Sequence, residues 1–195
     1  MSTDKNNINN KKGLYRQRFS ELAKLGILVF YASDLANLWQ IKNQNTLHTT
    51  LKRYAKEGTI IRLQKGLYSL LPVNKIDPAL LGLKILHRYG YIGGETVLIN
   101  NGIIFQAVPQ ITIVSSISKK FSIADHQYYS RQLADKYLYN DVGIINQNGI
   151  LIASVERAVA DLLYFNSKYY FDANNLIDWK KVRDIQKQIG YPEVF

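Results

Sequence analysis

Cysteine is absent from this sequence of 195 residues, which excludes disulfides, iron–sulfur clusters, cysteine-containing zinc sites and thiol nucleophiles. Histidine is scarce as well. His48, His87 and His126 are far apart in the sequence and form no HExxH motif. These observations make a metal enzyme a poor expectation. The sequence as a whole is predicted to have no metal site, no cofactor and no enzyme activity.

The sequence contains no segment that is expected to enter or cross a membrane. Residues 1–12 read MSTDKNNINNKK, and because they lack an apolar stretch, they are predicted to form a disordered tail rather than a signal peptide. The longest uncharged stretch, residues 96–118, contains asparagine, glutamine and proline and is too polar for a transmembrane helix. We expect a cytoplasmic location and no membrane partner.

Positive charge is concentrated in the first third of the sequence. The whole chain carries a formal net charge of +10. Residues 1–72 contain 12 Lys and Arg against 4 Asp and Glu, whereas residues 73–195 contain 13 against 11. Positive charge that only kept the protein in solution would not need to be concentrated at one end of the sequence. The asymmetry favours a module that binds a polyanion, joined to a nearly neutral second domain.

Residues 13–72 are predicted to form three helices followed by a β-hairpin. The first helix has its apolar residues at helical spacing and ends near Gly26. The apolar run ILVFYA is a candidate for a short strand, and Ser33 is a candidate N-cap for the second helix. A polar turn at residues 42–45 precedes the third helix, which is expected to begin from Asn43 or Asn45.

The third helix, NTLHTTLKRYAKEG, provides the main indication of function. Leu47, Leu51 and Tyr54 share one face and are predicted to be buried. The opposite face has small polar side chains near the beginning of the helix and cations near its end: Asn45, Thr46, Thr49, Lys52, Arg53 and Lys56. This pattern is typical of a helix that reads base edges in the major groove and meets phosphates with its basic end. An ordinary solvent-exposed face, with cations favoured by the helix dipole, would give the same pattern.

The segment after this helix favours DNA binding over the solvent-exposed alternative. Two β-rich runs, TIIRLQ and LYSLL, flank Lys65-Gly66, which is typical of a two-residue hairpin turn. Arg62, Gln64 and Lys65 are placed where a hairpin can touch the DNA backbone or the minor groove. Three helices followed by a basic hairpin is the plan of a winged helix-turn-helix. Residues 13–72 are therefore predicted to bind double-stranded DNA.

Residues 73–195 are predicted to form a mixed α/β domain, so the chain as a whole belongs to the α+β class. An apolar helix is expected to begin at Asp77-Pro78. Two glycines in GYIGGETVLINNGI precede a short helix; they match neither phosphate-binding glycine motif, and a close-packed turn is the preferred interpretation. Strand-like runs follow, with a hairpin turn at Asn148-Gly149.

A second notable helix, VERAVADLLYF, is predicted to begin after Ser154. Glu156 suits the positive end of the helix dipole. Arg157 and Asp161 are four residues apart and are expected to pair along the solvent-exposed face. A structural role accounts for all three charged side chains and is preferred over a chemical one.

Four stretches, in order, resemble the AbiEi family of antitoxins and transcriptional regulators, the regulatory half of type IV abortive-infection toxin–antitoxin systems. They are the third helix with a hairpin ending RLQKGLYSLLP, the segment GYIGGETVLINNGI, the strand pair around PQITIV, and the helix start ASVERAVADLLY. The resemblance covers residues 14–164. It implies a repressor of its own operon, acting at the promoter, whose second domain counteracts a nucleotidyltransferase-like toxin without necessarily forming a stable complex with it. It also places Glu156, Arg157 and Asp161 in the family's signature helix.

Two other classes of function stay open. A nuclease would need clustered carboxylates to hold Mg²⁺, whereas the acidic residues here are scattered along the sequence. A solitary ligand-responsive winged-helix transcription factor, without a toxin partner, would hold its effector in the second domain, which contains ten of the fourteen tyrosines. A downstream nucleotidyltransferase gene would favour the antitoxin, and a metabolic operon would favour the ligand-responsive regulator.

Overall fold

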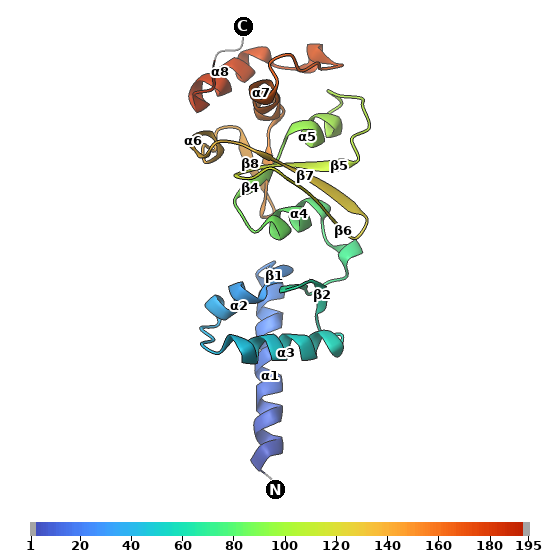
Figure 1. The fold of residues 1–195 in the computed structure, drawn as a ribbon, viewed down its shortest axis with the longest axis vertical. Coiled ribbons are helices and arrows are strands. Elements are labelled where there is room, and N and C mark those ends of the chain that lie inside the picture. Colours follow the sequence, from blue (N-terminus) through green and yellow to red (C-terminus); the bar gives the residue numbers. More distant parts are fainter. Residues whose placement is uncertain (1–2, 193–195) are drawn as a thin grey trace. The chain divides into compact units, whose positions relative to one another are not determined.

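The structure, a computed structural model, describes residues 3–192 of the chain. The chain divides into two compact units, residues 1–76 and 77–195 (Figure 1). Both units combine helices with strands, so the predicted α+β class is confirmed. The division falls slightly later than the predicted residue 73, because the short 3-10 turn Val73–Lys75 is grouped with the first unit.

The first unit is built from three helices and a three-stranded antiparallel sheet within its described residues. Its elements are α1 (Thr3–Lys24), β1 (Val29–Tyr31), α2 (Ala32–Leu38), α3 (Gln44–Lys56), β2 (Ile61–Gln64) and β3 (Leu67–Ser69). The central strand β3 pairs with β1 on one side and with β2 on the other. Phe19 of α1, Leu35 of α2 and Leu51 of α3 meet in one buried hydrophobic core.

The predicted hairpin at Lys65-Gly66 is confirmed. These two residues connect β2 to β3, and Gln64 lies opposite Leu67 in the antiparallel pair. Gly66 has a φ of 79°, in the left-handed region that L side chains rarely adopt. Glycine at this position therefore allows the tight connection that the hairpin needs.

Residues 3–12, which were predicted to be a disordered tail, belong to α1, so the tail prediction is wrong for them. Residues 1–2 lie outside the described part of the chain. The later turns of α1 bury Phe19 and Leu22 in the core of the first unit. Once these turns are fixed, each further residue adds a helical hydrogen bond at low cost, and no proline interrupts the preceding sequence.

The second helix begins earlier than its predicted cap would place it. α2 begins at Ala32, with Tyr31 rather than Ser33 in the N-cap position. The Asp34 carboxylate accepts a hydrogen bond from the backbone N–H of Tyr31 at 3.1 Å. An acid three residues after the cap thus stabilises the start of this helix, as in the second half of a capping box.

The second unit contains a six-stranded mixed sheet. Its elements are α4 (Pro78–Leu86), β4 (Gly90–Ile92), α5 (Gly94–Asn100), β5 (Gln110–Ser115), β6 (Lys119–Ile123), β7 (His126–Gln132), α6 (Asp135–Leu138), β8 (Ile144–Gln147), β9 (Ile150–Ala153), α7 (Val155–Phe165), a 3-10 turn (Asn174–Leu176) and α8 (Trp179–Ile189). The strand order is β6-β7-β5-β4-β9-β8. The pairs β5–β7 and β4–β9 are parallel, and the others are antiparallel.

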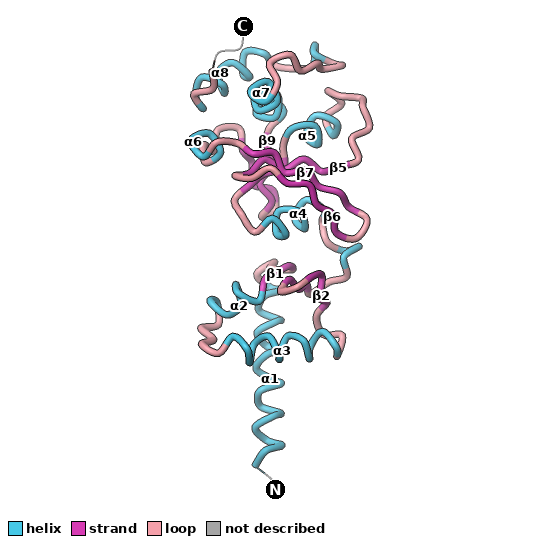
Figure 2. The backbone as a smooth tube through the Cα atoms, viewed as in Figure 1, coloured by secondary structure: helices cyan, strands magenta, loops and turns pink. Residues whose placement is uncertain are grey.

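Helices cover both faces of this sheet. Figure 2 shows α4 on one face and α5, α7 and α8 on the other. The central strands are consequently buried on both sides: Tyr91, Ile113 and Val114 are almost fully inaccessible to solvent. Among residues 3–192, no helix combines the length and the apolar character that crossing a membrane would require.

Candidate functional site

The start of α3 and the face that it buries agree with the sequence prediction. Asn43 is the N-cap, and its side chain accepts a hydrogen bond from the backbone N–H of Thr46 at 3.2 Å. Leu47, Leu51 and Tyr54 are buried against the core of the first unit. Since these three residues fix the rotation of the helix, its opposite face must point to solvent.

All six residues predicted on the polar face of α3 are exposed: Asn45, Thr46, Thr49, Lys52, Arg53 and Lys56. The guanidinium of Arg53 lies 4.0 Å from the Glu57 carboxylate and 5.4 Å from the centre of the Tyr54 ring. Within the described part of the chain, Lys52 and Lys56 form no ion pair. The basic end of the helix therefore presents cations that are available to an anionic partner.

The three predicted hairpin residues, Arg62, Gln64 and Lys65, are also exposed. The Gln64 side-chain amide donates a long hydrogen bond of 3.4 Å to the hydroxyl of Tyr31. Burial raises the pKa of Tyr31, which keeps this hydroxyl neutral. The pairing register of β2 with β3 shifts between Arg62 and Gln64, so the ladder of the hairpin is irregular beside its turn.

Two exposed residues of α3, Gln44 and His48, were missed by the sequence interpretation. They are four residues apart and therefore share one flank of the helix. By helical spacing they lie at the border between the buried face and the polar face of α3, so the spacing assigns them to neither face. Their relation to the hairpin depends on how β1 and β3 pair, which spacing within the helix does not reveal.

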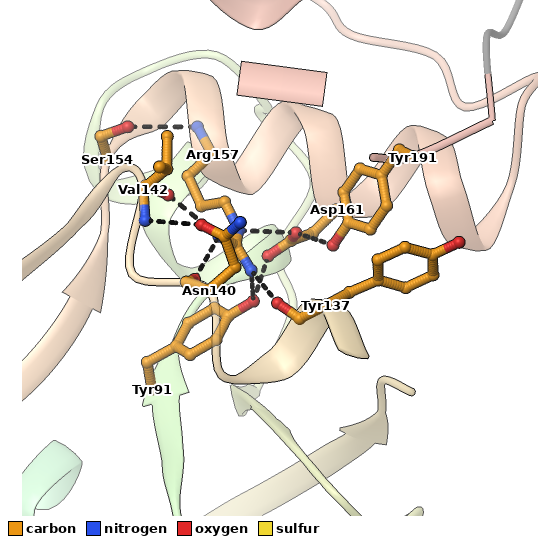
Figure 3. A network of polar contacts seen from close by, with 8 residues as sticks. All are labelled: Tyr91, Tyr137, Asn140, Val142, Ser154, Arg157, Asp161 and Tyr191. Carbon is orange, nitrogen blue, oxygen red and sulfur yellow. Dashed lines mark hydrogen bonds and ion pairs between the residues drawn. The ribbon is translucent and has the colours of Figure 1, made fainter. Parts of the chain in front are cut away.

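The second unit holds the Arg157–Asp161 pair, and its predicted position on a solvent-exposed face is wrong. Both side chains are 0% exposed. The Arg157 Nε donates to the Asp161 carboxylate at 2.9 Å, as expected for residues one helical turn apart. Figure 3 shows the guanidinium enclosed by groups from distant parts of the chain.

Every N–H donor of the Arg157 guanidinium has a partner. Nε contacts Asp161. Nη1 donates to the backbone carbonyls of Asn140 and Val142, each at 2.9 Å. Nη2 donates to the Tyr91 hydroxyl at 2.9 Å and to the Tyr137 carbonyl at 3.2 Å. Because a guanidinium has five N–H donors, this side chain has none left for a ligand.

The Asp161 carboxylate is equally well satisfied. It accepts hydrogen bonds from Arg157, from the Tyr91 hydroxyl at 2.7 Å and from the Tyr191 hydroxyl at 2.6 Å. All three partners donate, which suits an ionised, acceptor-only carboxylate. Burial raises the pKa of Asp161, while Arg157 and the two hydroxyls act in the opposite direction.

The other ionisable groups of this network keep their ordinary protonation at neutral pH. Burial and the nearby Asp161 carboxylate raise the pKa of both Tyr91 and Tyr191, so these hydroxyls stay protonated and can donate. Burial by itself would lower the pKa of Arg157, but Asp161, Tyr91 and Tyr191 together outweigh it, and the pKa of the guanidinium is raised. The arrangement is a closed structural network that joins α7 to β4 and to the segment after α8.

Glu156 does not belong to this network. It lies in the first turn of α7, and its carboxylate is 3.9 Å from the Nζ of Lys181 on α8. The predicted cap of the same helix is confirmed, because the Ser154 hydroxyl accepts a hydrogen bond from the backbone N–H of Arg157 at 3.1 Å. The three charged residues of the signature helix thus separate into one partly exposed acid and one buried pair.

The glycines before α5 form a close-packed turn, as preferred from the sequence. A Cβ added to Gly94 would lie 3.0 Å from the side chain of Thr112, and one added to Gly93 would lie 3.2 Å from Val114. These positions face the sheet of the protein itself. Across residues 3–192, no three His, Cys, Asp or Glu side chains gather closely enough to hold a metal ion.

A groove of about 720 Å³ lies on the second unit. Apolar side chains, among them Ile92, Ile111 and Ile152, line its floor together with residues at the beginnings of α4 and α7. Asn100 and Gln147 contribute exposed carboxamides. Its volume lies within the range of small-molecule sites.

Neither a scan against protein-family models nor a search of curated proteins gave a match for this chain.

Proposed function

We propose that the first unit is a winged helix-turn-helix module that binds double-stranded DNA. The observation that carries this proposal is the exposed polar face of α3, whose basic end lies opposite a fully buried apolar face. The order helix, strand, helix, helix and hairpin is that of winged helix-turn-helix domains. In such a module, α3 enters the major groove and the β2–β3 hairpin is the wing.

The exposed side chains fall into two chemical groups, which would make different kinds of contact with DNA. Asn45 and Thr49 carry short polar groups that can hydrogen-bond base edges. Lys52 and Lys56 lie farther along the helix and would neutralise phosphates without reading sequence. Lys65 at the hairpin turn would add a backbone or minor-groove contact.

Salt dependence of DNA binding tests this proposal. We expect the full chain to bind a 30-base-pair duplex with an affinity that falls steeply as salt rises. The double substitution Lys52→Ala/Arg53→Ala should reduce the slope of log affinity against log salt by about 0.9 for each phosphate that the variant no longer neutralises. A matched variant, Lys84→Ala/Arg88→Ala, removes two exposed cations from the second unit and should leave the slope unchanged. Equal slopes for all three proteins would overturn the proposal.

We further propose that the chain represses its own operon and acts as the antitoxin of a type IV toxin–antitoxin system. This part rests on the resemblance of residues 14–164 to the AbiEi family. The near-neutral second domain supports it indirectly, because a domain with little excess charge is not suited to bind a polyanion by itself. We assign the counteraction of a nucleotidyltransferase-like toxin to this domain and promoter binding to the first.

Co-expression with a nucleotidyltransferase-like toxin, taken from the operon that encodes this chain, would separate the two activities. The Lys52→Ala/Arg53→Ala protein should protect cells nearly as well as the parent chain, although it no longer represses a reporter under the operon promoter. Protection that disappears together with repression would mean that the chain acts only by silencing its operon.

The groove on the second unit favours one alternative, a solitary ligand-responsive regulator without a toxin partner. Its apolar floor, its exposed amides and the carboxylate of Asp77 suit a small effector that is partly apolar and carries polar groups. Ile111→Glu would place a charge on this floor. Under the alternative, that substitution abolishes the response of a promoter reporter to growth conditions; under the antitoxin proposal, it leaves promoter repression intact.

A further inference from the structure

The flank of α3 that carries His48 faces a small hollow of about 140 Å³ on the first unit. The hollow is lined by residues from β1, α2, α3 and the hairpin turn: Tyr31, Ser33, Ala36, Gln44, His48 and Gly66. It therefore lies where the beginning of α2, the side of α3 and the turn of the proposed wing come together. Gln44, His48 and Ser33 are exposed at this place.

The position of His48 on the helix decides what it can meet on DNA. With about 100° between successive residues, Asn45 and Thr49 point along the middle of the polar face. Thr46 and Arg53 lie on one flank, and His48 lies on the other. A helix in the major groove, which is about 12 Å wide, has a sugar-phosphate strand beside each flank. The flank that holds His48 must therefore approach one of these strands.

The hairpin turn lies on the same flank, because Gly66 lines the hollow together with His48. The backbone pairing holds it there: the N–H of Ala32 donates to the Gly66 carbonyl at 2.8 Å. Lys65 precedes Gly66 and is exposed. A DNA strand along this flank would therefore contact both α3 and the proposed wing.

Four parts of the first unit contribute charged or titratable groups at the residues that line the hollow or next to them along the chain. Lys52 lies one turn farther along α3, and Lys65 lies in the hairpin turn. β1 contributes the hydroxyl of Tyr31, and α2 contributes the carboxylate of Asp34. This carboxylate accepts a hydrogen bond from the Tyr31 backbone N–H and another, at 3.5 Å, from the Ser33 hydroxyl.

We propose that His48 contacts a backbone phosphate of duplex DNA at this hollow, and that its protonation makes DNA affinity increase as the pH falls from about 8 to about 5. This rests on the proposed DNA-binding function. Imidazole gains its proton in this pH range, and the protonated ring is a cation with two N–H donors. The neutral ring offers only one donor and no charge to the phosphate. Acid pH therefore adds one electrostatic contact to the interface.

Fluorescence anisotropy with a labelled 30-base-pair duplex of random sequence tests the inference, because phosphate contacts do not depend on sequence. For the full chain, we expect about tenfold tighter binding at pH 5.5 than at pH 7.5. At the lower pH, the salt slope should be steeper by about 0.9. His48→Gln should bind with less than a twofold change over the same range. His48→Lys should bind at pH 7.5 as tightly as the parent does at pH 5.5.

His126→Gln is the matched control, since it removes an imidazole from the second unit and should keep the pH dependence of the parent. Circular dichroism melting curves show whether each variant is folded at both pH values. If the parent and His48→Gln bind with the same pH dependence, the inference is wrong while the proposed DNA binding stands. If no folded protein binds the duplex at any pH and low salt, both are wrong.

Discussion

Replacing Tyr91 by phenylalanine should destabilise the second unit more than replacing Tyr191 by phenylalanine. Tyr191 only donates to Asp161, and this carboxylate oxygen keeps its second donor, the Nε of Arg157, when the hydroxyl is removed. Tyr91 donates to Asp161 and also accepts from Arg157. Its removal therefore leaves one N–H of a buried cation without a partner.

The magnitudes follow from these contacts. A hydrogen bond to a charged group contributes about 1.5–3 kcal/mol, so Tyr191→Phe should lower the free energy of unfolding by that amount. Tyr91→Phe removes two such bonds and should cost more. Asp161→Asn leaves the Arg157 cation without its counter-charge, for which about 3–5 kcal/mol is expected. Tyr170→Phe, at a position that is 74% exposed, is the control and should stay within about 0.5 kcal/mol of the parent.

Urea unfolding followed by tryptophan fluorescence measures these differences. The chain has two tryptophans, Trp39 in the first unit and Trp179 in the second. A Trp39→Phe background leaves Trp179 as a reporter of the second unit alone, and linear extrapolation gives the free energy of unfolding. The closed network is refuted if Tyr91→Phe costs no more than Tyr191→Phe, or if both behave like the Tyr170→Phe control.

Three further predictions concern other parts of the molecule. Asn43→Ala removes the side-chain cap on the Thr46 N–H and should destabilise the first unit by about 1 kcal/mol. Asn43→Asp keeps a capping oxygen and should not destabilise it. Equal melting temperatures for the two variants would contradict this prediction. Gly94→Val forces a side chain against Thr112 at a positive φ, and it should reduce the yield of folded protein or lower its melting temperature, which a thermal melt of the purified variant would show. Burial and the nearby Asp77 raise the pKa of Tyr128 from 10 to about 12. As the pH rises, the unfolded chain therefore loses this proton before the folded chain does, and the free energy of unfolding should fall between these two values. A Tyr128→Phe protein with the same alkaline loss of stability would argue against this.

The polar face of α3 could be predicted because the information is local. Leu47, Leu51 and Tyr54 lie within one helix, and their spacing alone fixes which side is buried. The Asn43 cap and the Lys65-Gly66 turn are local in the same sense, since each depends on a few consecutive residues. These features of the candidate DNA interface were accordingly found from the sequence.

The burial of Arg157 could not be predicted in the same way. Its spacing from Asp161 indicated an ion pair, but the groups that enclose the pair come from β4 and from the end of the chain. Tyr91 is 70 residues away from Asp161, and Tyr191 is 30 residues away. One local signal was available: Ala158, Val159, Ala160 and Leu162 surround the pair with apolar side chains, which leaves little of this helix for solvent.

The central claim, that α3 and the β2–β3 hairpin contact duplex DNA, is tested most directly by amide chemical-shift mapping. A ¹⁵N-labelled sample of the full chain would be titrated with a 15-base-pair duplex. We predict that the largest shifts fall within residues 43–57 and 61–67, and that they vanish in high salt, which weakens binding to the phosphates. Shifts confined to residues 77–192, with α3 and the hairpin unchanged, would contradict the claim.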